Sequence, residues 1–166
     1  MAFSLLTAFI LTSFLFCSTL ARCYSAATSN GDVADAAVAE VGSTDWSYAS
    51  SEGGMCVGGR NSNKCNLFVA DILKARGKKA PERRWLCYSP IGANEWANAA
   101  SDYLTDDNCW SLVSSCYQRG DVAATGGHVG IVTGAGTTTS AAHNSVVQND
   151  WGFRTGQNPT FWRYVC

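Results

Sequence analysis

Apolar residues recur at helical spacing in the first half of the chain. One stretch begins at Asp32, which can cap a helix, and ends at Gly42, a residue type that stops helices. Its apolar residues share one face: Val33, Ala37, Val38 and Val41. A second stretch starts at Cys65, after a loop rich in Gly, Ser and Asn from Ser50 to Asn63, and stops at Arg76-Gly77. Four apolar residues of this second helix should face a core: Leu67, Phe68, Ile72 and Leu73.

The second half of the chain has a different pattern. A further helix is predicted from Ala93 to Leu104, and after it come short segments rich in β-formers, separated by Gly or polar turns. The segments are Trp110–Val113, Asp121–Ala124, His128–Thr133, Thr137–Ala142, Ser145–Gln148 and Thr160–Val165. Helices followed by short strands indicate an α+β fold, with N-terminal helices packed on an antiparallel sheet.

The N-terminal segment is typical of a secretory signal peptide. Residues 1–21 contain no Asp, Glu, Lys or Arg, and the apolar run Leu5–Phe16 is followed by small residues that suit a cut after Ala21. A membrane-spanning helix is a weaker interpretation because this run is shorter than the ~20 apolar residues that a span needs. We therefore expect a secreted, extracellular protein with one domain over residues 22–166, present as a monomer.

The number of cysteines points to one free thiol. Cys17 would be lost with the signal peptide, which leaves seven: Cys23, Cys56, Cys65, Cys87, Cys109, Cys116 and Cys166. In an oxidising compartment an odd count leaves one thiol free or paired between chains. We expect Cys65 to be free and the other six to form three bridges, whose pairing the sequence does not rank. The alternative is that Cys65 is bridged and a terminal cysteine such as Cys23 is free.

The charge balance argues against several kinds of partner. The net charge is −1, from 12 basic and 13 acidic residues, with no long run of either sign. Such a surface offers no broad electrostatic footprint for nucleic acid or an anionic membrane. Cys-x-x-Cys pairs and His clusters are absent from the sequence, so neither a metal site nor a cofactor is expected.

Cys65 and His128 form the strongest candidate for catalytic chemistry. Cys65 lies at the start of a helix, where the macrodipole contributes up to ~2 kcal/mol and lowers a thiol pKa by roughly one unit. A neighbouring protonated histidine is expected to supply the remaining activation. The chain has two histidines, His128 and His143. His128 lies at the start of the strand-like run from Gly127 to Val132.

Three segments carry a resemblance to a known enzyme family. The helix Cys65–Leu73, the Gly120-Asp121-Val122 strand entry and the run Gly127–Gly134 resemble the NlpC and CHAP group of papain-like cysteine peptidases. Trp46-Ser47, residues 149–154 and residues 161–163 look like the type VI secretion amidase effectors of bacteria. With the signal peptide and the cysteines, the chain resembles the domesticated forms secreted by ticks and mites. The resemblance implies a disulfide-stabilised papain-like fold and an antibacterial, innate-immunity amidase or endopeptidase that acts on bacterial peptidoglycan.

The resemblance also implies roles for individual residues. Cys65 is the expected nucleophile, His128 the general base, and the N–H of Cys65 a donor to an oxyanion hole. A third polar group usually orients the imidazole, and in the NlpC pattern it is often a histidine twelve residues after the first. Here that position is Ser140, our first choice, followed by Asn144 on the same strand face and then His143. A dyad oriented by the backbone alone is a further alternative.

Three residues are candidates for binding the substrate. Trp46 and Trp151 could line a groove for the stem peptide, although a Trp in a small protein is as often part of the core. Arg154 could bind a stem-peptide carboxylate, although most arginines are solvated. The sequence leaves open which stem-peptide or crosslink bond is cut, and whether diaminopimelate or lysine walls are preferred.

Two other functions remain open at this stage. A thiol acyltransferase or an ordinary protein peptidase would use the same Cys-His chemistry. In a different class, Arg119-Gly120-Asp121 is an integrin-type tripeptide that a secreted adhesion ligand could display. An exposed loop tip would favour integrin binding, whereas a strand start with Asp121 facing inward would remove it.

Overall fold

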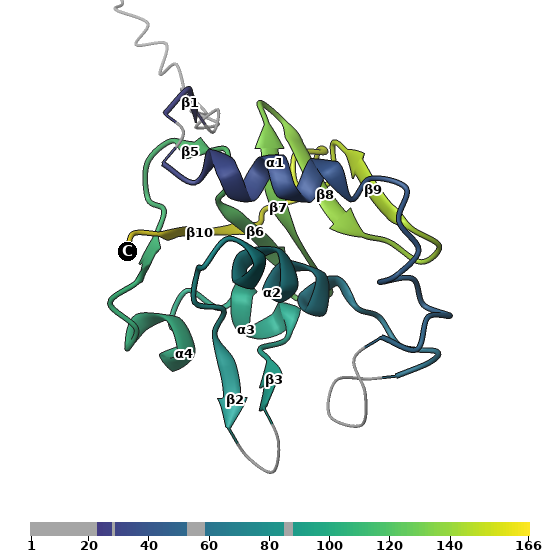
Figure 1. Ribbon diagram of the computed structural model, residues 1–166. Coiled ribbons are helices and arrows are strands. Elements are labelled where there is room, and N and C mark those ends of the chain that lie inside the picture. The colour runs from purple at the N-terminus through teal and green to yellow at the C-terminus, as the bar shows by residue number, and fades with distance from the viewer. Residues whose placement is uncertain (1–22, 28, 53–58, 85–87) are drawn as a thin grey trace, which may run out of the picture.

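The computed structural model describes residues 23–27, 29–52, 59–84 and 88–166, and these form an α+β fold (Figure 1). Its main element is a six-stranded sheet in the order β4-β10-β6-β7-β8-β9, in which every neighbouring pair is antiparallel. The strands are β4 Trp110–Leu112, β6 Val122–Thr125, β7 His128–Gly134, β8 Thr137–Ala141, β9 Val146–Asn149 and β10 Thr160–Tyr164. All six expected strands are confirmed, with ends within one residue of the segments predicted from the sequence.

Two helices cover one face of this sheet. The helix α1 spans Gly31–Ala39, and α2 spans Cys65–Ala75. Both contact β7 and β8, and Figure 1 shows them side by side in front of the sheet. The cap of α1 differs from the expectation, because Asn30 is its N-cap and Asp32 lies in its first turn.

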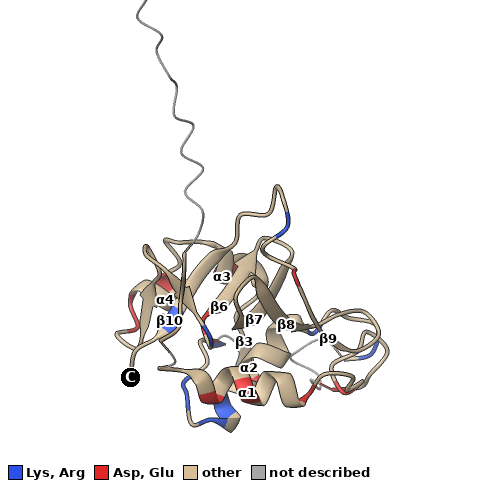
Figure 2. Ribbon diagram, turned by 90° about the horizontal axis from the view of Figure 1, so that it is seen from above, with Lys and Arg blue, Asp and Glu red and all other residues tan. Residues whose placement is uncertain are grey.

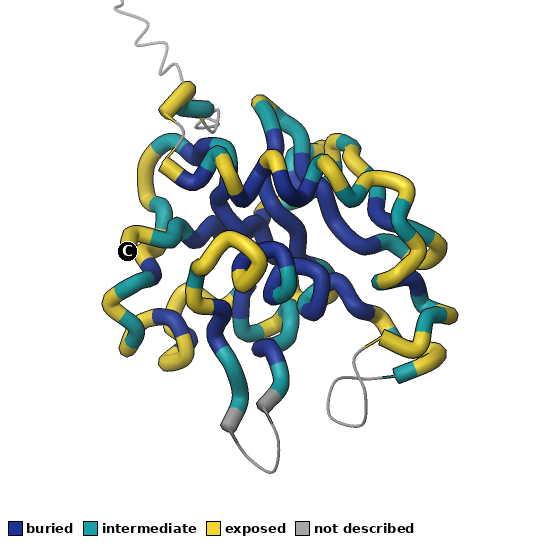
Figure 3. The backbone as a smooth tube through the Cα atoms, in the orientation of Figure 1, coloured by how far each residue is buried: buried dark blue, intermediate teal, exposed yellow. Residues whose placement is uncertain are grey.

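The largest core cluster lies between these helices and the sheet. Phe68 and Leu73 of α2 are fully buried there, as are Val129 and Ile131 of β7. Figure 3 shows the buried backbone concentrated at this layer. At about 25 cal/mol per Å² of apolar surface, packing of this kind is the main contribution that holds α2 on the sheet.

The helix expected over Ala93–Leu104 was wrong as a single element. The structure has α3 at Ala93–Ala97 and α4 at Asp102–Thr105. Between them Asn98 takes an extended backbone, and its Oδ1 accepts a hydrogen bond from the N–H of Ala100 at 3.0 Å. Because such a local turn competes with helical hydrogen bonds, the helix ends and a new one starts after Ser101.

Two small strand pairs were not predicted. β1 at Tyr24–Ser25 pairs in parallel with β5 at Tyr117–Gln118. β2 at Glu82–Arg84 and β3 at Tyr88–Pro90 form an antiparallel pair, which projects below α2 in Figure 1. Ion pairs hold β2 to the helices, Lys74 to Glu82 and Arg83 to Glu95, each at 2.5 Å.

A second, aromatic cluster packs on the sheet face opposite the helices. Tyr117 stacks on Phe161 with ring centroids 5.3 Å apart, and Phe153 lies 4.8 Å from Tyr117. Val132 of β7 is part of this cluster, and Trp151 packs against its edge. Alternate residues of β7 therefore face two different packed layers.

Two disulfides are present among the described residues, Cys23–Cys116 and Cys109–Cys166. Cys65 carries a free thiol and is buried. The expectation for Cys65 is therefore confirmed, and the alternative in which Cys23 is free was wrong. Cys56, Cys87 and the expected signal peptide lie outside the described residues.

Charged residues are interspersed along the described chain (Figure 2). Several are paired, among them Lys79 with Asp107 at 2.8 Å. No helix of the described residues combines the length and the apolar character that a membrane crossing requires. Within the same residues, no three His, Cys, Asp or Glu side chains are grouped in a way that could hold a metal ion.

Candidate active site

Cys65 is the first residue of α2 and is only 6% exposed. Backbone N–H groups of Val129, Asn66 and Cys65 itself point to its sulfur and favour the thiolate. Burial outweighs them and raises the pKa of the Cys65 thiol above its ordinary value. The helix start was expected to lower the thiol pKa, and the direction is the opposite, because a buried thiolate loses its hydration.

His128 is the first residue of β7. Its Nε2 lies 2.9 Å from the Oγ of Ser140 on the neighbouring strand β8. The ring of Trp151 meets the imidazole edge-on, with centroids 4.5 Å apart. Burial lowers the pKa of His128, so the imidazole is neutral at neutral pH.

A small cavity brings Cys65 and His128 together. Its volume is about 120 Å³. The lining residues come from α2, the loop before it, the turn between β6 and β7, and the end of β8: Tyr48, Asn63, Lys64, Cys65, Gly127, His128, Ala141, Ala142 and His143. The sulfur also lies against the N–H of Val129, the residue after His128. The two residues that the sequence paired therefore share one cavity.

The cavity holds the two groups that a proton transfer from a thiol to an imidazole requires, both in their neutral forms. When Nε2 carries the ring proton it donates to Ser140 Oγ, and Nδ1 keeps a lone pair that can accept the thiol proton. The N–H of Cys65, at the start of an 11-residue helix, is available to a developing oxyanion. Ser140 is a neutral partner, so it orients the imidazole without stabilising an imidazolium through charge.

Lys64 is a residue of the site that sequence reasoning missed. It is the N-cap of α2 and only 3% exposed. Its Nζ donates to three backbone carbonyls, those of Ser47 at 3.0 Å, Ser62 at 3.3 Å and Tyr48 at 3.4 Å. Burial lowers the pKa of Lys64, and Glu52 opposes this. No sequence signal marks a lysine as a clamp between loops, since lysine is usually exposed.

Tyr48 and His143 form one wall of the cavity. Their rings stack with centroids 4.7 Å apart, and the N–H of Tyr48 donates to the carbonyl of His143 at 2.8 Å. His143 and its neighbour Asn144 are both exposed. Of the three candidates for the third catalytic residue, Ser140 is the one whose side chain the structure places against His128.

The candidate substrate residues lie in different settings. Trp151 lies against His128, as described. Trp46 instead packs edge-on against Phe68 of α2 and donates its Nε1 to Asp71 at 2.8 Å. Arg154 is paired with Asp150 at 2.7 Å on the surface. Trp46 therefore belongs to the packing of α2, and Arg154 already has a carboxylate partner.

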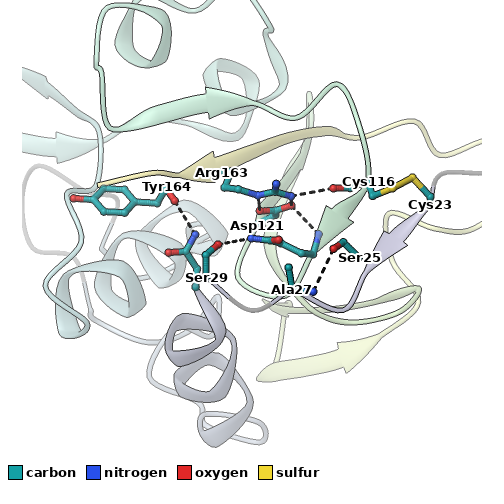
Figure 4. Close-up of polar contacts among 10 residues, drawn as sticks. Cys23, Ser25, Ala27, Ser29, Cys116, Asp121, Arg163 and Tyr164 are labelled. Atoms are coloured by element: carbon teal, nitrogen blue, oxygen red, sulfur yellow. Dashed lines mark hydrogen bonds and ion pairs between the residues drawn. A yellow bond between two sulfur atoms is a disulfide. The ribbon is translucent and has the colours of Figure 1, made fainter.

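The integrin-type tripeptide does not form an exposed tip. Asp121 is fully buried and accepts two hydrogen bonds from Arg163, each at 2.8 Å (Figure 4). Its Oδ2 also accepts the N–H of Gln118 at 2.9 Å. Arg119 donates to the carbonyl of Thr133 and pairs with Asp35. Because Asp121 faces inward, this segment has no carboxylate to offer an integrin.

Comparison with protein families, curated proteins and solved structures finds no match to this chain. The function must therefore be inferred from the chemistry of the cavity. Three features define it: a free thiol at a helix start, an imidazole in the same cavity, and a hydroxyl 2.9 Å from Nε2 of that imidazole.

Proposed function

We propose that this protein is a secreted cysteine hydrolase that cleaves amide bonds in bacterial peptidoglycan. The observation that carries the proposal is the shared cavity of Cys65 and His128, with Ser140 bonded to the imidazole. A free cysteine beside the two disulfides of the described residues also supports it, because an unpaired thiol in an oxidising compartment is retained mainly for its reactivity.

In the proposed reaction, Nδ1 of His128 takes the proton of Cys65 as the sulfur attacks the carbonyl carbon of the amide. The oxyanion that forms is stabilised by the N–H of Cys65. The imidazolium then gives its proton to the nitrogen of the departing amine, which leaves a thioester on Cys65. A water molecule, deprotonated by His128, hydrolyses the thioester and restores the thiol.

The substrate class comes from the resemblance of the Cys65, Gly120-Asp121-Val122 and His128 segments to NlpC and CHAP amidases. The α+β architecture agrees with the papain-like fold that this resemblance implies. The cavity has room for a small part of a peptide, and its walls near the thiol are polar: Tyr48, Asn63 and His143. A polar, amide-rich ligand such as a stem peptide suits such walls better than an apolar one.

The test is digestion of purified peptidoglycan and defined muropeptides, with fragments identified by mass. The native protein should release fragments that differ by one hydrolysed amide. Cys65→Ala should abolish release while keeping the circular dichroism spectrum, because no disulfide is lost. His128→Ala should fall nearly as far, since members of one catalytic unit are not additive.

His143→Ala is the matched control, because the chain has two histidines and both line the cavity. Its loss of activity should be much smaller than that of His128→Ala. Undiminished hydrolysis by Cys65→Ala, or a greater loss from His143→Ala than from His128→Ala, would contradict the proposal.

The same experiment separates the two related chemistries. An acyltransferase would give a product joined to an added amine, and a protein peptidase would cut casein but not muropeptides. Hydrolysed muropeptide without a transfer product supports the amidase.

A further inference from the structure

Gly130 faces the same side of the sheet as His128, because it lies two positions after His128 along β7. On that side Val132, the next residue of the alternation, packs in the aromatic cluster with Tyr117 and Phe161. The intervening Val129 and Ile131 face the helices. Gly130 is thus part of the surface on which the imidazole is held.

Across the sheet Gly130 lies against Ser140 of β8. A Cβ at position 130 would come within 2.9 Å of the Cβ of Ser140 and 3.0 Å of the carbonyl oxygen of Thr139. Both atoms are fixed by the backbone of β8, so neither can turn away as the end of a long side chain could. The close approach of β8 at this point therefore requires glycine.

This approach determines the position of the Ser140 hydroxyl. Ser140 is 2% exposed, and its Oγ reaches Nε2 of His128 at 2.9 Å. Since Oγ is bonded directly to Cβ, any displacement of the strand moves the hydroxyl with it. Hydrogen bonds between a nitrogen and an oxygen usually have lengths of about 2.7–3.2 Å and prefer a nearly linear geometry, so a shifted hydroxyl makes a weaker bond.

The same strand supports the second neighbour of the imidazole. Thr138, two residues before Ser140, donates its Oγ1 to the carbonyl of Trp151 at 2.8 Å. Trp151 in turn lies edge-on to the His128 ring. Strand β8 therefore holds both groups that contact the imidazole on this face, and its distance from β7 is set at Gly130.

We propose that Gly130 is a positioning residue of the catalytic site. By lacking a side chain it lets the Ser140 hydroxyl lie 2.9 Å from Nε2 of His128. From there the hydroxyl accepts the proton of the Nε2-protonated tautomer and favours this form, which leaves a lone pair on Nδ1. The effect on reaction rate depends on the proposed function, whereas the effect on the tautomer does not.

The first test is the nitrogen-15 spectrum of the imidazoles in Gly130→Ala. Each of the two histidines is assigned from its own alanine variant. The native protein should show His128 as a single tautomer protonated at Nε2, and Gly130→Ala should show a mixture. Hydrolysis of muropeptides should fall about tenfold, the scale of losing one oriented hydrogen bond to a general base.

Gly134→Ala is the control, because it places the same methyl group on the same strand. There a Cβ would meet only Thr137, at 3.6 and 3.7 Å, which is ordinary contact. The tautomer and the rate should stay as in the native protein. A folded Gly130→Ala that keeps a single Nε2-protonated tautomer overturns the proposal.

A double-mutant cycle covers the case in which Gly130→Ala does not fold. Ser140→Gly removes the Cβ that a side chain at 130 would strike, so the double variant Gly130→Ala/Ser140→Gly should fold. Its tautomer mixture and rate should equal those of Ser140→Gly alone, because Gly130 acts through Ser140. Additive losses, or a single tautomer in Ser140→Ala, would refute the positioning role.

The outcomes also separate this inference from the proposed function. If the native protein cleaves no muropeptide, the tautomer spectra and the cycle still decide the role of Gly130. If it cleaves muropeptides and the tautomer is unaffected in both Ser140→Ala and Gly130→Ala, the proposed function stands and the positioning role is wrong.

Discussion

At the scale of single residues, the protonation of His128 should determine the pH range of the proposed activity. Burial lowers the pKa of His128 from its ordinary 6.5, so the imidazole stays a neutral base as the pH falls below that value. The rate should fall only when the pH passes through the lowered pKa. We expect the acid limb of kcat/KM for muropeptide hydrolysis to have its midpoint below 6.5.

The control for this pH profile is His143→Ala, which should leave the acid limb in place. A midpoint at or above the ordinary pKa would mean that the imidazolium is stabilised in the free enzyme. The thiol and imidazole would then form an ion pair, in contrast to the neutral pair described here.

The Cys65 thiol gives a second prediction at this scale. Burial raises its pKa above the ordinary 9.0, so alkylation by iodoacetamide should accelerate only at more alkaline pH than for an exposed cysteine. Among the described cysteines, mass spectrometry should place the label at Cys65 alone. Fast alkylation at neutral pH would show a stabilised thiolate.

At the scale of elements, Lys64 joins the loop of Ser47 and Tyr48 to the start of α2. Lys64→Met keeps much of the side-chain volume and removes the ammonium, which leaves three carbonyls without this donor. Two of these bonds are only partly buried, so we expect a loss of about 1–2 kcal/mol in the free energy of unfolding. Chemical denaturation measures it.

The hydrogen bonds of Lys64 should also affect substrate binding, because they hold Tyr48, which is part of the cavity wall. Lys64→Met should raise KM more than it lowers kcat. Lys74→Met is the control, since Lys74 lies on the exposed side of the same helix and pairs with Glu82 on the surface. Equally small changes of KM in Lys64→Met and Lys74→Met would contradict a role of Lys64 in shaping the cavity.

The elements differ in how far the sequence predicted them. The six strands of the main sheet were predicted within a residue because their β-branched residues lie between Gly and polar turns. β2 was missed because Glu82 and Arg83 do not favour strands and are held by ion pairs with α2 and α3. The break in the third predicted helix depends on the side chain of Asn98, which helical spacing does not detect.

The residues of the site also differ in how far the sequence predicted them. Cys65 and His128 each stand in a recognisable local setting, a helix start and a strand start. Ser140 was expected from the resemblance to the NlpC pattern, in which the third residue stands twelve positions after the histidine. Lys64 and Gly130 could not be predicted, because their roles depend on loops and strands that meet only in the folded chain. Trp46 was a candidate for substrate binding, yet its indole packs on Phe68 beneath the helix.

At the scale of the whole molecule, stability should depend on the two disulfides found among the described residues. Cys109 and Cys166 close a loop of 57 residues, and its removal should cost about 2–5 kcal/mol. Cys109→Ser/Cys166→Ser should therefore lower Tm by about 10 °C by calorimetry. Cys65→Ser should lower it far less, because that thiol has no bridge.

Reductant should consequently have two opposed effects on the native protein. A mild reductant restores a Cys65 thiol that oxidation has blocked, and activity should rise or hold. A strong reductant with heat opens the structural bridges, and activity should collapse. Activity that survives full reduction with an unchanged Tm would contradict a structural role for the bridges.

The two disulfides overlap in the chain, since the loop from Cys23 to Cys116 and the loop from Cys109 to Cys166 share the segment 109–116. A single proteolytic cut at any peptide bond between Cys23 and Cys166 falls inside at least one of these covalent loops. The two pieces then remain joined as one molecule. A protein built in this way can be nicked by a protease without coming apart.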